Sequence, residues 1–267
     1  MVVRKPAVAG TFYPREKEEL EHLMDLLCGS EHHEKIKAKS ILVPHAGYIY
    51  SGKTACQVYK QVELPSRIIL LGPNHTGYGE PISVYHGDAW ETPYGIVEID
   101  KELREKILEF PHAKTDELAH IYEHSLEVQI PFIQRYSKAD FKILPIIVAF
   151  LEYEIAREFG KFLGKVLKDK DAFIVISSDM SHYISADEAR KKDEILMAAM
   201  ERLNTEELYF KAIQYNITMC GVVPAVIGIE AAKVLGAREG IVVDYTNSGE
   251  VNGDFSKVVA YLGMIFI

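Results

Sequence analysis

The 267-residue sequence has little cysteine, a single tryptophan and no excess of basic residues. Its three cysteines, Cys28, Cys56 and Cys220, are an odd number, and their spacings fit no zinc-ribbon pattern. No apolar run reaches the roughly 18 residues that span a bilayer, and residues 1–10 lack the apolar core of a signal peptide. We therefore expect no membrane segment and a cytoplasmic protein in a reducing compartment.

The charge balance argues against a nucleic-acid partner. The chain has 39 acidic and 30 basic residues, and a net charge of -9, whereas nucleic-acid surfaces show a basic excess or a basic stripe. Asparagine and glutamine are scarce, with five of each, while lysine and glutamate are plentiful. That composition is typical of a protein from a hot environment, so we expect a thermophilic source.

Short apolar runs rich in β-branched residues alternate with longer amphipathic stretches. The runs predict strands that are buried on both faces, at residues 40–43, 67–71, 141–148, 172–176 and 240–243. The stretches predict helices at residues 15–28, 51–61, 101–110, 125–136, 152–167, 186–203 and 221–235. This alternation predicts one α/β domain over residues 1–267, a three-layer α/β/α sandwich with a largely parallel, mixed sheet. The last run, residues 257–267, fits an antiparallel strand.

Polar motifs follow three of the predicted strands. They are residues 44–48 (PHAGY), 72–77 (GPNHTG) and 177–183 (SSDMSHY). Because ligands bind beyond the carboxyl ends of strands in open α/β sheets, we expect His45, His75, Asp179 and His182 to share one pocket. A lone histidine after a strand is more often a turn residue, and Asp179 also fits a helix N-cap. Two histidines at neighbouring strand ends favour a functional site.

Cys220 lies in a fourth motif, residues 218–224 (TMCGVVP), at the start of a predicted helix. The helix dipole there favours the thiolate, so we expect a low thiol pKa that suits a metal ligand or a nucleophile. The alternative is a small buried hydrophobic residue, which is common for free cysteine. Cys28 and Cys56 lie on amphipathic helices, and we assign them structural roles.

Residues 116–127 hold two pairs of candidate groups. His120 and His124 are four residues apart, as are Glu123 and Glu127, so on a helix each pair would share a face. The segment does not match HExxH, which excludes a zinc-protease motif. A solvated helix start is the alternative interpretation, and the sequence leaves the role of His120 open.

Together these motifs resemble the Memo family, named for a mediator of cell motility. The resemblance rests on residues 4–14 (RKPAVAGTFYP), 44–52 (PHAGYIYSG), 72–75 (GPNH), 91–95 (ETPYG), 123–127 (EHSLE) and 178–183 (SDMSHY). It implies a fold similar to that of the class III extradiol dioxygenases of the LigB type, which hold Fe(II) with two histidines and a carboxylate. By motif position His45 and His75 match the histidine ligands, His182 matches the acid/base histidine, and Cys220 falls where the carboxylate would be.

The resemblance also implies chemistry and partners. The family is reported to bind iron or copper through two histidines and one cysteine and to act in redox chemistry. Its animal members bind phosphotyrosine peptides, and archaeal and bacterial relatives often accompany a radical-SAM protein. A thiolate in place of a carboxylate favours Cu(I) or Zn over Fe(II), which makes ring cleavage of a catechol doubtful.

Three functions follow as hypotheses. The first is a metal-dependent, dioxygenase-like redox protein, a non-haem oxidoreductase with Fe(II) or Cu at His45, His75 and Cys220. His182 would move protons, Asp179 would set the tautomer of His182, and His124 would lie at the substrate edge.

The second hypothesis is a non-catalytic module that binds a phosphorylated or anionic ligand or peptide. Helix N-termini would supply the donors. Few arginines lie near the motifs, Arg4 and Arg190 being the nearest in sequence, which weakens this hypothesis because phosphate recognition usually recruits arginine. The third is a zinc-dependent hydrolase with the same ligands and His182 or Asp179 as the base.

Overall fold

Four parallel strands form the centre of the sheet in the computed structural model, which describes residues 1–29, 34–137 and 140–267. Across the sheet their order is β8 (Lys142–Val148), β3 (Arg67–Pro73), β9 (Ala172–Ser177) and β2 (Ser40–Val43). Beyond the first residue of β8, β3 and β9, all of their residues are buried, since both faces of the sheet are covered. The buried strands predicted at residues 40–43, 67–71, 141–148 and 172–176 are confirmed. Residues 240–243 also form a strand, but only Gly240 of them is fully buried, so the expected burial on both faces is wrong there.

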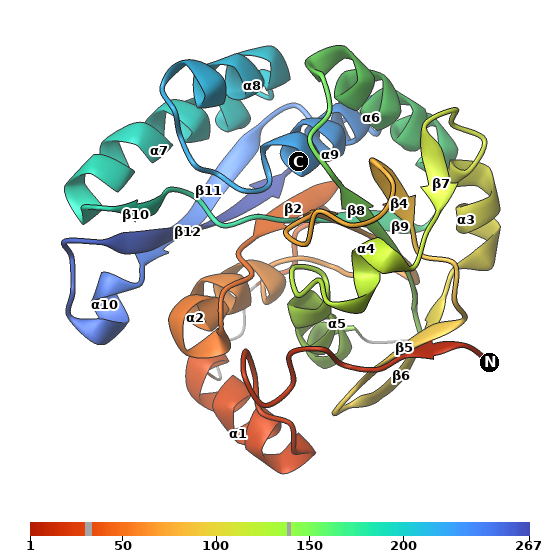
Figure 1. The fold of residues 1–267 in the computed structure, drawn as a ribbon, viewed down its shortest axis with the longest axis horizontal. Helices are drawn as coiled ribbons and strands as arrows, with labels where there is room; N and C mark the ends of the chain where they lie inside the picture. The colour runs from red at the N-terminus through yellow and green to blue at the C-terminus, as the bar shows by residue number, and fades with distance from the viewer. Residues whose placement is uncertain (30–33, 138–139) are drawn as a thin grey trace.

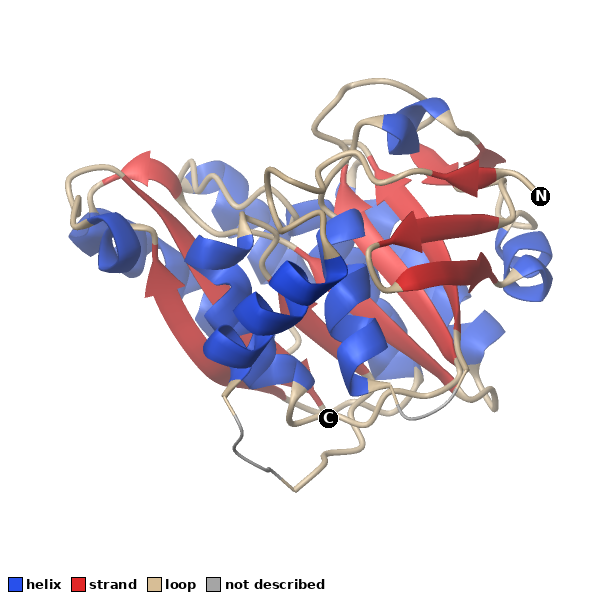
Figure 2. Ribbon diagram, turned by 90° about the horizontal axis from the view of Figure 1, so that it is seen from below, coloured by secondary structure: helices blue, strands red, loops and turns tan. Residues whose placement is uncertain are grey.

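Helices cover both faces of the sheet, which gives three layers (Figure 1). The helices of one face are α1 (Lys17–Cys28), α2 (Tyr48–Tyr59) and α5 (Ile130–Tyr136). Those of the other are α6 (Tyr153–Leu167), α7 (Ala186–Glu201), α8 (Thr205–Gln214) and α9 (Val222–Val234). Helix α9 is apolar on nearly all sides because it lies between the sheet and helices α6 and α8. Figure 2 shows helices in front of and behind the slanted strands, as the three-layer prediction requires.

Further strands extend the sheet at both edges. At one edge β12 (Val258–Phe266) runs antiparallel to β2, as predicted, and also pairs with β11 (Gly240–Asn247) and β10 (His182–Ile184). The elements at the other edge are β1 (Val3–Arg4), β4 (Ile82–Val84), β5 (Ala89–Thr92), β6 (Gly95–Ile99), β7 (Ala113–Thr115) and helix α3 (Lys101–Ile107). Within the described residues, none of the helices has the length and apolar character that crossing a membrane requires.

The helices differ from the prediction in two places. The predicted helix over residues 125–136 begins as the 3-10 helix η1 (Glu127–Gln129) and becomes α5 only at Ile130, and before it lie α4 (Leu118–Ile121) and a turn. Residues 116–127 do not form one helix, so the condition under which the two histidines and the two glutamates would share helix faces is not met. Helix α8 was not predicted, and neither was α10 (Gly249–Asn252). Helix α8 packs against α7 and α9, and α10 packs against β11. Hydrophobic periodicity along the chain does not show such contacts with other elements.

Helices α1 and α2 are joined by a disulfide between Cys28 and Cys56. The two helices pack against each other, which brings the Cα atoms to 5.1 Å, and both side chains are buried. The two residues are structural, as expected, but the expectation of reduced thiols is wrong for this pair. The spacing of 28 residues carried no signal for it, because only the packing of α1 on α2 brings the residues together.

Breaking this disulfide should lower the free energy of unfolding by about 3.5 kcal/mol, because the bond closes a loop of 28 residues in the unfolded chain. The measurement is denaturant unfolding of the protein with and without reductant, and of the Cys28→Ala/Cys56→Ala variant. Cys220→Ser is the control and should keep the full sensitivity to reductant. Three free thiols in denatured, unreduced protein would show that the bond is absent.

Candidate metal centre

His45, His75 and Cys220 meet at the carboxyl end of the central strands. His45 follows β2, His75 follows β3, and Cys220 lies just before α9. Strands β2, β9 and β3 are direct neighbours, so their ends open onto the same edge of the sheet. The ligand atoms of the three residues all lie within 4.8 Å of one another, close enough to hold one metal ion.

The hydrogen bonds of His45 determine its tautomer. The hydroxyl of Ser177 donates its proton to the carbonyl of Ser125 at 2.7 Å, so it must accept at the 2.9 Å contact with Nδ1 of His45. Nδ1 therefore carries the proton, and Nε2, 3.2 Å from Sγ of Cys220, keeps a lone pair. Burial and then the nearby His124 and His75 lower the pKa of His45 well below its usual value, which keeps the ring neutral.

Glu123 orients His75 in the same way. One carboxylate oxygen accepts from Nδ1 of His75 at 2.9 Å, and the other accepts from the backbone N–H of His75 at 2.7 Å. Burial acts to raise the pKa of Glu123, but the hydrogen bond and charge of His75 outweigh it and lower that pKa to about 2. The carboxylate is thus ionised, and Nε2 of His75 is left for a ligand. Carboxylate–histidine pairs of this kind typically orient metal-bound histidines.

Cys220 lies at the centre of the group but is not an acidic thiol. Its Sγ accepts from the backbone N–H of Asp179 at 3.2 Å. Burial, and then the charge of Asp179, raise the pKa of the Cys220 thiol far above its usual value. The expected low pKa of the Cys220 thiol is therefore wrong for the protein without a metal, because burial outweighs the effect of the helix terminus. Bound metal cations deprotonate a coordinating thiol, which would reverse this.

Asp179 and His182 lie near the group, but they do not pair as predicted. Nδ1 of His182 donates to the backbone carbonyl of Thr218 at 2.9 Å, so Thr218 and not Asp179 sets its tautomer. Asp179 instead accepts from the backbone N–H of His45 at 2.8 Å and positions that residue. Burial raises the pKa of Asp179 to about 6.

The structure separates His124 from His120. The ring of His124 lies 4.7 Å from that of His75 and 5.3 Å from that of His45, centroid to centroid, so His124 belongs to the site. His120 is fully buried away from it, against Tyr85 and Trp90, with Nε2 bonded to the carbonyl of Ser83. Its Nδ1 has no hydrogen-bond partner in the described part of the chain. His120 thus has a structural place in the core.

His120 should make the protein less stable in acid. Burial, and then the charge of Arg4, lower its pKa from 6.5 to about 3 in the folded state. Below pH 6.5 the unfolded chain binds a proton that the folded chain does not, so stability falls as the pH falls towards 3. Between pH 6.5 and 4.5 the expected loss is about 2.3 kcal/mol.

Unfolding by denaturant across this pH range tests the role of His120. His120→Gln should reduce the pH dependence by about one proton. The exposed His112 offers a control, His112→Gln, which should leave the pH dependence unchanged. An unaltered slope in the His120 variant would contradict the assignment.

Sequence reasoning missed the residues that hold the site in place. Ser177 and Gln129 fix His45, Glu123 fixes His75, and Thr218 fixes His182 through both its hydroxyl and its carbonyl. A signal existed for three of them, because Ser177 directly follows a predicted strand, Glu123 directly precedes His124 and Thr218 opens the motif that contains Cys220. Nothing local marked Gln129, whose partners Pro44 and Ser177 are far away in sequence.

Arg4 and Glu127 anchor the N-terminal motif beneath the site. The guanidinium of Arg4 bonds the carboxylate of Glu127 at 2.7 Å and the carbonyl of Glu123 at 2.8 Å. Glu127 also accepts from Tyr13 and from the N–H groups of Ala7 and Val8. Arg190 pairs with Glu194 on α7. Arg4 is thus committed to a buried ion pair, and Arg190 lies in an exposed pair on α7, so neither arginine adds support to the binding-module hypothesis.

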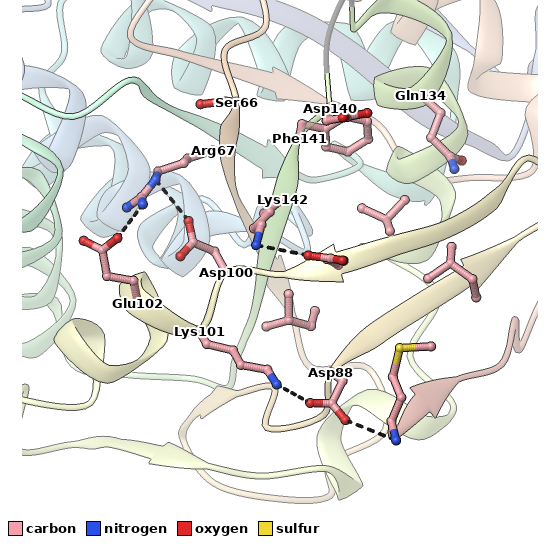
Figure 3. Close-up of a pocket in the computed structure, with 15 residues that line it drawn as sticks. Ser66, Arg67, Asp88, Asp100, Lys101, Glu102, Gln134, Asp140, Phe141 and Lys142 are labelled. Carbon is pink, nitrogen blue, oxygen red and sulfur yellow. Dashed lines mark hydrogen bonds and ion pairs between the residues drawn. The ribbon is translucent and has the colours of Figure 1, made fainter.

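A hollow of about 1130 Å³ lies at the other end of the strands (Figure 3). Most of its charged side chains are paired with one another: Arg67 with Asp100 and Glu102, Lys101 with Asp88, and Lys142 with Glu98. Among the described residues, the groups that could hold a metal ion do not lie in this hollow.

The fold of this chain, an α/β sandwich with its candidate site at the carboxyl ends of the strands, is similar to that of a solved structure. A solved structure, the uncharacterized protein JW3007 from Escherichia coli K12, superposes with a TM-score of 0.54 over 85% of this chain and 99% of that chain. At 13% identity this likeness concerns the fold alone.

The profile of the family described as "Memo-like protein" matches residues 4–265. The chain is 76% identical to a MEMO1 family protein of Aquifex aeolicus over the full length of both. It is 40% identical to another from Methanosarcina acetivorans, over 99% of each chain. The chain therefore belongs to the Memo-like protein family.

Proposed function

We propose that this chain is a metal-dependent redox protein that holds an iron or copper ion between His45, His75 and Cys220. The observation that supports this best is the convergence of three ligand atoms within 4.8 Å. Both imidazoles are also held through Nδ1, which leaves each Nε2 as a donor. Hydrogen bonds that orient two histidines, distant in sequence, toward one point are characteristic of metal sites.

The donor set suits soft and borderline ions. Two neutral imidazoles and one thiolate fit copper and zinc well, and they also fit iron. When bound, a redox-active ion would transfer electrons. Three protein ligands would leave it able to bind a further molecule. The same donors would hold zinc in a hydrolase, so the identity of the metal separates these two functions.

The surrounding residues would position the ligands and move protons. Nδ1 of His182 is committed to the Thr218 carbonyl, so its Nε2 can accept a proton from a bound molecule. Burial is the largest influence on the His124 pKa and lowers it, so His124 presents a neutral ring beside His75. Asp179 keeps the backbone of His45 in place.

Metal analysis of protein purified without a histidine tag tests the proposal. We expect about one equivalent of iron or copper, or its uptake when Fe(II) or Cu(I) is added without oxygen. Protein that is metal-free and refuses both ions would overturn the proposal. Tight zinc binding together with esterase or amidase turnover would favour the hydrolase instead.

A further inference from the structure

A cavity of about 490 Å³ lies directly beside the candidate metal centre, with Cys220 in its wall. Its other walls come from the ends of β3 and β8 with the residues that follow them, from helix α8, from the loop between α8 and α9, and from the first turn of α9. The side chains that line it include Phe150, Tyr209, Ile213 and Val222. Its volume lies within the range of about 300–1,000 Å³ that is usual for small-molecule sites.

The lining of this cavity carries no charge. None of the described residues that form it is acidic or basic, in contrast to the ion-paired hollow of Figure 3. Two of its polar side chains are already engaged. The hydroxyl of Tyr209 donates to the carbonyl of Leu151 at 2.9 Å, and the amide of Asn74 donates to the carbonyl of Tyr78 at 2.7 Å. A charged ligand would lose its hydration here without an ionic partner.

Large apolar side chains stand exposed at the mouth of the cavity. Phe150 is 74% exposed and Ile213 is 57% exposed, although both line the cavity. Core packing does not explain these positions, since neither side chain is buried. Exposed apolar side chains around a hollow typically mark a place where a ligand is bound.

We infer that this cavity receives the organic substrate of the metal centre, and that the substrate is an uncharged, mainly apolar molecule of one or two rings. The role as a substrate pocket rests on the proposed function, because it places the molecule next to Cys220 and so beside the metal ligands. Apart from a metal ion held by Cys220, the walls offer no charge to a phosphorylated or other anionic molecule, which favours an uncharged one. Branched aliphatic and aromatic walls favour contact with a flat ring.

Indole and phenyl phosphate are the probes that test the inference on the full-length protein as purified. Indole should shift the NMR signals of isotope-labelled methyl groups on Met219 and Ile217, which line the cavity. Phenyl phosphate should bind at least about tenfold more weakly. Absence of indole shifts, or equal binding of both probes, would overturn the inference.

A charged substitution at the mouth locates the binding. Ile213→Asp should weaken indole binding about tenfold with little risk to folding, since the side chain is exposed. Leu118, 60% exposed on helix α4, offers the matched control Leu118→Asp, which should bind indole normally. Indole binding that Ile213→Asp does not affect would overturn the assignment to this cavity.

Metal content measured on the same samples separates the two proposals. If the wild-type protein carries its metal but does not bind indole, this inference is overturned and the proposed function is not. Normal indole binding in a protein that takes up neither iron nor copper would leave the cavity as a ligand site and overturn the proposed function.

Discussion

Cys220→Ser should weaken the binding of Cu(I) and Fe(II) by more than about 100-fold, while the fold stays intact. Losing a direct ligand should exceed the 10–100-fold loss that follows removal of an outer partner. A serine hydroxyl is a poor donor to either ion in this position, and only two imidazoles would remain. The affinity is measured by competition with a chromophoric chelator under anaerobic conditions.

Two further variants should have smaller effects on metal affinity. Glu123→Gln keeps the shape of the side chain but weakens the hold on His75, so affinity should fall by about 10–100-fold. His182→Ala removes a histidine that is bonded to Thr218 and lies outside the ligand group, and it should leave metal affinity unchanged. Wild-type affinity in Cys220→Ser would show that the thiol is not a ligand.

Arg4→Met should lower the free energy of unfolding by about 3–5 kcal/mol. The guanidinium and the carboxylate of Glu127 are both almost fully buried, with side-chain exposures of 5% and 1%. Removing the cation leaves a buried carboxylate without its charge partner. It also frees the carbonyls of His120 and Glu123 in the segment that holds His75.

Denaturant unfolding checks this prediction against two further variants. Arg4→Met/Glu127→Gln should recover part of the loss, because no unpaired charge remains buried. Lys5→Met removes the neighbouring cation, which forms an exposed ion pair with Glu91, and should change stability by less than about 1 kcal/mol. Equal effects of the two single variants would show that burial of the pair is not decisive.

Much of the fold and part of the site follow from local patterns. The central strands could be predicted because burial on both faces demands continuous apolar runs, such as residues 67–71 and 172–176. His45 and His75 could be identified because parallel strands end at one edge of the sheet. Short strands such as β4 and β7 could not, because three residues carry too little pattern.

The parts that failed depend on contacts between distant segments. Asp179 was expected to orient His182, but Thr218, 36 residues further along the chain, occupies that position. Cys220 was expected to be acidic, but its burial beside Asp179 has the opposite effect. A helix was expected over residues 125–136, but α5 begins only at Ile130, and Glu123 in the segment before it bonds His75.

The sequence by itself determined the three-layer α/β architecture and the residue types that gather at one edge of its sheet, since both follow from hydrophobic pattern and strand direction. Only the tertiary structure decided which ring nitrogen of His45 and of His75 keeps its lone pair. It also decided that the pKa of the Cys220 thiol is raised and not lowered, and which cavity lies beside that residue. Those properties depend on hydrogen bonds and desolvation between groups that are far apart in the chain. Such contacts arise only when the elements pack.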